Sequence, residues 1–141
     1  MYKKTITYED YNGSTRTEDF YFNLTEAEVT EMQLSVKGGF AEMINNMVKA
    51  NDLGSLIGIM KEMIVKSYGI KSDDGRRFIK KPEYVEEFTE TPAFSALYME
   101  LATDEKAAAN FINKVMPAKF VAEAEKNAKE NSTVTNLPSG T

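Results

Sequence analysis

The chain has 141 residues and a mass of 15.8 kDa, the size of one domain with its own hydrophobic core. It contains no cysteine and no histidine, which excludes disulfides, thiolate metal sites, cysteine nucleophiles and histidine-based triads. The formal net charge is −5, with 17 basic and 22 acidic residues, and this balance argues against a nucleic-acid partner. No apolar run is typical of a signal peptide or long enough to span a membrane, so we expect a soluble cytoplasmic protein.

A β-hairpin is predicted over residues 2–22. Apolar residues share one parity in two runs, Tyr2, Ile6 and Tyr8, then Phe20 and Phe22. The dipeptide Asn12-Gly13 lies between the runs and suits the positive φ angles of a tight hairpin turn.

A helix is predicted to begin after Thr25, which forms a capping box with Glu28. We expect this helix to end near Gly38-Gly39, a pair that favours a left-handed cap. A second helix over residues 40–50 follows, because its apolar residues recur at the helical period.

Asp52 is the expected N-cap of a third helix over residues 53–68, with Gly69 as its left-handed C′ residue. Apolar residues lie on more than one side of this segment. We therefore expect it to be the central buried helix.

The second half of the chain is predicted to be mostly helical. After a polar loop at 71–77 and a short extended pair, Phe78-Ile79, helix-start signals occur at Pro82, Thr91-Pro92 and Thr103-Asp104. The fold class expected is mainly α (α+β): the hairpin, then a bundle of five or six helices over about 25–116, in a single globular domain at 1–117. Residues 118–141 are predicted to be weakly helical and then disordered.

No catalytic, metal or cofactor site is predicted. Carboxylates are the only plentiful catalytic side chains, and their scatter nominates no acid–base pair. Asp73-Asp74 lacks the spacing of a calcium loop and is interpreted as part of a solvated turn. An enzyme is therefore not expected.

Two sets of residues are candidates for binding a protein partner. The first is a basic cluster that includes Arg76 and Arg77, which either contacts a partner or is a surface loop balanced by the glutamates after it. Its members are Lys71, Arg76, Arg77, Lys80 and Lys81. The second set lies on the apolar faces of the helices at 40–50 and 53–68, where it forms either core or a groove for a client. Its members are Phe40, Met43, Met47, Met60 and Met63.

The order of the motifs resembles a known family. The run Tyr-Lys-Lys-Thr-Ile-Thr-Tyr at 2–8 precedes Asn12-Gly13, and Ser67-Tyr68-Gly69 precedes Asp-Gly-Arg-Arg-Phe at 74–78. Phe111-Ile112 and Pro117 complete the order. From about Tyr2 to Pro117 the chain resembles the tail assembly chaperones of long-tailed bacteriophages that infect Gram-positive bacteria.

That resemblance implies a non-catalytic assembly factor without cofactors. Such proteins coat the tape measure protein, keep it soluble and help to recruit tail tube protein. They act in the host cytoplasm and leave before the tail is complete, so we expect the chain to be absent from the mature virion. Self-association through a strand edge of the hairpin, at 2–8 or 16–22, is a further hypothesis. The alternative is a structural virion component, such as a head–tail connector or tail completion protein.

Overall fold

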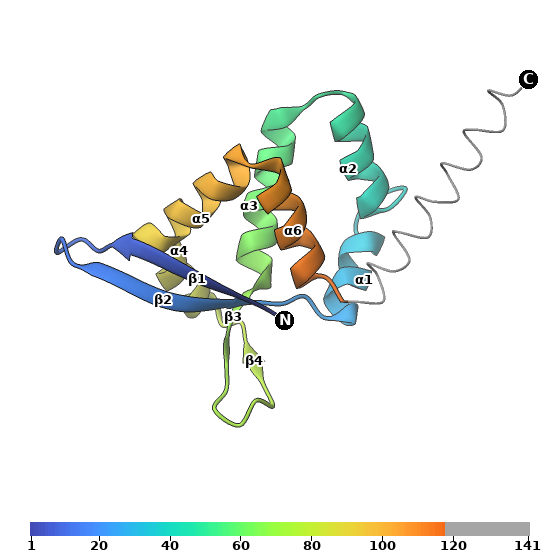
Figure 1. Ribbon diagram of the computed structural model, residues 1–141. Helices are drawn as coiled ribbons and strands as arrows, with labels where there is room; N and C mark the ends of the chain where they lie inside the picture. The colour runs from blue at the N-terminus through green and yellow to red at the C-terminus, as the bar shows by residue number, and fades with distance from the viewer. Residues whose placement is uncertain (118–141) are drawn as a thin grey trace, which may run out of the picture.

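A computed structural model describes residues 1–117, which form a small antiparallel sheet and a set of helices (Figure 1). The predicted weakly helical and disordered segment at 118–141 lies outside the described residues. In chain order the elements are β1 (Tyr2–Glu9), β2 (Thr15–Phe22), α1 (Glu26–Leu34), α2 (Phe40–Lys49), α3 (Leu53–Ser67), β3 (Tyr68–Lys71), β4 (Phe78–Ile79), α4 (Pro82–Thr89), α5 (Pro92–Thr103) and α6 (Glu105–Val115). The expected α+β class is confirmed.

The sheet has the order β1-β2-β3-β4, with antiparallel pairing throughout. β1 and β2 form the predicted hairpin, in which Tyr2 is paired with Phe22 and Glu9 with Thr15. Gly13 has a φ of 82°, as the turn prediction requires. The Asp10 carboxylate accepts hydrogen bonds from the backbone N–H groups of Asn12 and Ser14, which fixes the turn.

β3 and β4 extend the sheet beyond the predicted hairpin. β3 pairs with β2 only at Tyr21 and Phe22, and then with β4 through Ile70 and Lys71. The β3–β4 hairpin projects from the body on the side away from α3, α5 and α6 (Figure 1).

The hydrophobic core lies between the sheet and α3, α5 and α6, and aromatic rings fill its centre. Phe22 is fully buried, and its ring packs edge-on against Tyr68, Phe88 and Phe111 at centroid distances of 5.8, 5.9 and 5.3 Å. Tyr68 and Phe88 stack at 4.2 Å. Because these rings come from β2, β3, α4 and α6, the cluster joins the sheet to the helices.

The prediction that Gly69 caps the third helix is wrong. The predicted left-handed C′ residue is instead a buried residue of β3, opposite Tyr21. α3 ends at Ser67, and its C-cap residue Tyr68 is already extended, with ψ of 142°. A Cβ at Gly69 would lie 2.7 Å from the ring of Phe78, so glycine serves here for close packing and not for a positive φ.

One further boundary, and the burial of one helix, differ from expectation. α1 ends at Leu34, not near Gly38, and Ser35 is its C-cap, with its hydroxyl and N–H donating to the carbonyls of Met32 and Glu31 in the last turn. α3 is buried only toward its C-terminal end, at Met63, Ile64 and Ser67. Its first residue, Leu53, is 60% exposed, so this helix is central along half of its length.

Candidate partner-binding surface

One turn and a side-chain cap set the position of α2 beside α1. Gly38 and Gly39 have φ angles of 84° and 95°, which allow the chain to reverse after α1. The Gln33 side-chain oxygen of α1 accepts hydrogen bonds from the N–H groups of Phe40 and Ala41, at 2.9 and 3.3 Å. These bonds satisfy two free donors at the start of α2, where Gly39 supplies no side-chain cap.

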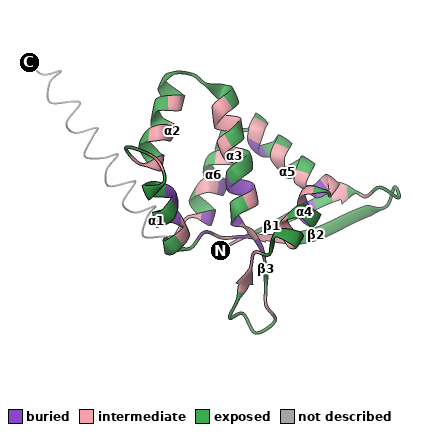
Figure 2. Ribbon diagram, turned by 180° about the vertical axis from the view of Figure 1, so that it is seen from behind, coloured by how far each residue is buried: buried purple, intermediate pink, exposed green. Residues whose placement is uncertain are grey.

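The apolar face of α2 is only partly covered. Among residues 1–117, α2 is the one helix without a buried residue, and Figure 2 shows it in the colours of intermediate and exposed positions. Phe40, Met43, Ile44 and Met47 are half-buried, and Val48 is 58% exposed. The helix therefore presents apolar side chains that the described part of the chain does not fully cover.

A shallow hollow of about 580 Å³ lies beside this face. Met43, Met47, Val36 and Ala50 form its apolar part, and Lys37, Glu42 and Asp52 are among its polar residues. We call the apolar face of α2 and this hollow, together, the α2 surface. Flexible methionines at the edge of an open hollow are suited to partners of variable shape.

The structure separates the five predicted apolar anchors. Met43 and Met47 line the hollow, whereas Phe40 and Met60 are half-buried and pack against the core. Met63 is 2% exposed and belongs to the core itself. The α2 surface is therefore narrower than the set of residues that the sequence suggested.

The residues of the predicted basic cluster also do not act together in the structure. Lys80 Nζ donates to the Asn23 carbonyl at 2.6 Å and to the Glu28 carboxylate at 2.7 Å, so it ties β4 to the start of α1. Lys81 Nζ lies 5.8 Å from the centre of the Tyr84 ring. These two lysines have partners within their own fold.

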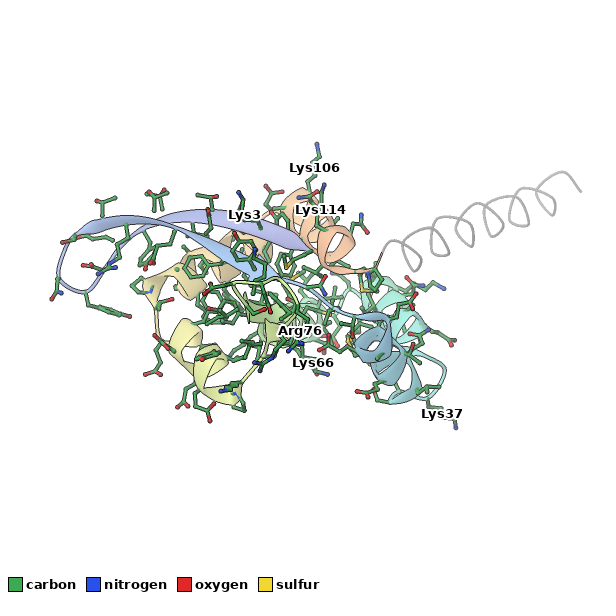
Figure 3. The ribbon with its side chains drawn as sticks, turned by 90° about the horizontal axis from the view of Figure 1, so that it is seen from below. Lys3, Lys37, Lys66, Arg76, Lys106 and Lys114 are labelled. Carbon is green, nitrogen blue, oxygen red and sulfur yellow. The ribbon has the colours of Figure 1, made fainter. Side chains whose placement is uncertain are left out.

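Arg76 and Arg77 are exposed in the turn between β3 and β4, and Figure 3 labels Arg76. Within residues 1–117 neither guanidinium forms an ion pair. Asp74 accepts hydrogen bonds from the Ser72 hydroxyl and the Arg76 N–H, and these bonds lower the pKa of its carboxyl group. This turn lies apart from the α2 surface, so the two predicted partner-binding sets do not form one site.

A second hollow was not predicted from the sequence. It has a volume of about 460 Å³ and lies between the turn end of the β1–β2 hairpin, β3 and α4. We call it the aromatic cleft, because its lining includes Tyr8, Phe20, Tyr68, Tyr84 and Phe88. These residues come from distant parts of the sequence, and β3, which sequence reasoning missed, brings Tyr68 beside β2 and α4.

The strand-edge hypothesis remains a prediction. β1 is paired on one side only among residues 1–117, and β3 leaves β2 unpaired from Thr15 to Phe20. Both edges carry free backbone donors and acceptors.

Residues 1–117 contain no group of three or more acidic residues placed to hold a metal ion. In the same part of the chain, no helix has the length and apolar character needed to cross a membrane.

The model of a family described as phage tail assembly chaperone matches residues 1–139, nearly the whole chain. Neither a curated protein nor a solved structure matches the chain significantly.

Proposed function

The chain belongs to the phage tail assembly chaperone family, and we propose that it binds and solubilises the tape measure protein in the host cytoplasm. In this role it also helps to recruit tail tube subunits and leaves before the virion is complete. Chaperone families are generally non-catalytic, which agrees with the expectation of an assembly factor. A long-tailed phage and a Gram-positive host stay predictions from the sequence resemblance.

One observation carries the proposal: the apolar face of α2 is only partly covered and lies beside an open hollow. A tape measure protein is a long, largely helical client, and a helix binds a groove through apolar residues at positions i, i+3, i+4 and i+7. Met43 and Met47 stand one helical turn apart and both line the hollow, so together they offer apolar contacts to one face of such a client helix. The flexible thioether side chains adapt to different client segments.

The charges around the hollow agree with such a client. Lys37 lies on the lining with Glu42 and Asp52, so charges of both signs are available to polar groups on a bound helix. The net charge of −5 favours solubility of a complex in which several chaperone copies coat one client.

The test is co-expression of the full chain with the tape measure protein of the same genome. We expect a soluble complex that can be isolated from the soluble fraction, with several copies of the chaperone per client. An insoluble client with no isolated complex would contradict the proposal. Recovery of the chain from purified virions would favour the alternative, a structural component of the particle.

A pair of variants then locates the binding surface. Met47→Glu places a charge in the hollow and should abolish recovery of the soluble client. Asn45→Glu adds the same charge to an exposed position on the other side of α2 and should leave recovery unchanged. Equal recovery with the two variants, both shown to be folded by circular dichroism, would place the client elsewhere.

A further inference from the structure

The aromatic cleft has an aromatic wall and an acidic border. The stacked rings of Tyr68 and Phe88 lie at its inner side, and Tyr84 of α4 lies on its lining. The carboxylates of Glu87 and Glu90 also line it. Such a combination of ring faces and carboxylates is the usual environment for a bound guanidinium group.

The negative charge of the cleft is only partly neutralised by the residues that line it. Four carboxylates line it, from Asp10, Glu18, Glu87 and Glu90, against the single cation Arg16. Arg16 is paired with Asp10 at 2.7 Å, and Glu18 accepts the hydroxyl hydrogen bond of Tyr8. Within residues 1–117, Glu87 and Glu90 form no ion pair.

Two of these carboxylates also affect the pKa of the Tyr68 hydroxyl. Burial raises the pKa of Tyr68, and the negative charges of Glu87 and Glu18 raise it further. A cation that enters the cleft therefore meets a negative potential beside partly buried rings, where attraction is screened less than on open surface.

The complementary group is on the same chain. The turn between β3 and β4, residues 72–77, carries Arg76 and Arg77, and Lys71 precedes it. All three are exposed, and the hairpin that holds them projects from the body of the molecule (Figure 1). Hydrogen bonds from Ser72 N to Arg77 O and from Gly75 N to Ser72 O, both 2.8 Å, keep the backbone of the turn ordered, so little backbone conformational entropy is lost when it binds.

We propose that the 72–77 turn of one copy of this chain docks in the aromatic cleft of a second copy. Arg76 and Arg77 then lie against the ring of Tyr68 and pair with Glu87 and Glu90 of the neighbour. Arginine and tyrosine are the residues that most often dominate binding energy at protein interfaces. A second copy is favoured over an unrelated partner because the chain itself holds both charged surfaces, each left unpaired.

The contact joins two different surfaces, and this limits the assemblies it can form. Two copies that each donate a turn to the other make a closed dimer, whereas a one-way contact makes rings or longer chains. The contact is separate from the α2 surface, so a copy bound in this way keeps its proposed client surface free.

Sedimentation equilibrium of the full chain, without any client, tests the proposal. We expect association that rises with protein concentration and weakens at high salt, because the attraction is between charges. The variants R76E/R77E and E87K/E90K should each weaken association by on the order of tenfold or more. A wild-type chain that stays monomeric at low salt and high concentration would overturn the proposal.

Each variant has a control with the same change of net charge. K106E/K114E alters two exposed lysines of α6, which Figure 3 shows at one edge of the molecule, away from Arg76. E83K/E86K alters two exposed glutamates of α4 that do not line the cleft. Both controls should associate as the wild type does, and a loss of association equal to that of the test variants would contradict a specific contact.

Mixing the two test variants gives the sharpest result. R76E/R77E keeps an acidic cleft and E87K/E90K keeps a basic turn, so an equimolar mixture should regain association that neither variant has alone. No recovery on mixing, with both variants folded, would overturn the proposal. Because no tape measure protein is present, this outcome is independent of the client test.

Discussion

α2 and α6 are helices of similar length, 10 and 11 residues, and both carry apolar residues on one face, yet the fold uses them differently. α6 packs on β1, α3 and α5 and buries Phe111 and Val115 almost completely. α2 contacts α1 and α3 and buries no residue. The contrast teaches that an amphipathic pattern identifies an apolar face but not what covers it. In α6 the cover is the protein's own core, and in α2 we propose that it is a client.

The largest expected effect comes from truncating the face of α6. Phe111→Ala removes a ring that contacts Phe22 and Tyr2, and should lower the free energy of unfolding by about 3–5 kcal/mol. Met43→Ala on α2 removes a half-buried side chain and should cost less than about 1.5 kcal/mol. Urea denaturation measures both, and equal losses would contradict the difference between the two helices.

Two glycines extend the comparison between packed and uncovered positions, one in β3 and one in α3. Gly69→Ala brings a methyl group within 2.7 Å of the Phe78 ring and should cost about 1–3 kcal/mol, because that ring and β4 must shift. Gly58→Ala lies on an exposed position of α3 with no heavy atom within 4 Å of the new Cβ. That change should raise the free energy of unfolding by about 0.5–1 kcal/mol, the usual gain of alanine over glycine in a helix.

Thermal melts of the two glycine variants should therefore move in opposite directions. A stabilising effect of Gly69→Ala would show that β3 and Phe78 are less tightly packed than described.

The smallest effect concerns the link between α1 and β4. Burial opposes ionisation of Glu28, but hydrogen bonds from Lys80 and from the Thr25 N–H outweigh it and lower the pKa below 4.5. An ionised Glu28 therefore stabilises the fold above pH 4.5, and this contribution is lost as the pH falls through the lowered pKa. Glu28→Gln should lower stability at pH 7 and flatten the decline in stability as the pH falls below about 4.5.

Glu31→Gln, at an exposed position on the same helix, is the matched control and should keep the wild-type pH dependence. Denaturation midpoints at a series of pH values separate the two. Parallel curves for Glu28→Gln and the wild type would show that the Lys80 contact does not contribute.

The sequence predicts the local structure well because local signals determine it. The capping box of Thr25 and Glu28 and the Asn12-Gly13 turn are formed by neighbouring residues, and both are present in the fold. Asp52 and Thr91 also cap the helices that they were expected to begin.

What sequence reasoning missed depends on contacts between distant residues. Gly69 has the local appearance of a helix cap, but pairing with Tyr21, far away in the chain, draws it into a strand. The aromatic cleft follows from that same strand, since Tyr68 reaches it only after β3 has joined β2. No periodicity within one segment indicates a site of this kind.

The same limit applies to the apolar anchors. In the sequence, Met43, Met47 and Met63 all lie on the apolar faces of predicted helices. In the structure the first two line an open hollow and the third is in the core. Which face of α3 meets α5 decides this difference, and that choice is made by the packing of the whole domain.

Hydrogen exchange of the chain, free and in complex with its tape measure protein, tests the central claim most directly. Free α2 should exchange its amide hydrogens faster than α6, because few buried contacts protect it. On binding, α2 should become protected while α6 stays unchanged. Unchanged exchange in α2 with a bound client, or protection of free α2 equal to that of α6, would contradict the account.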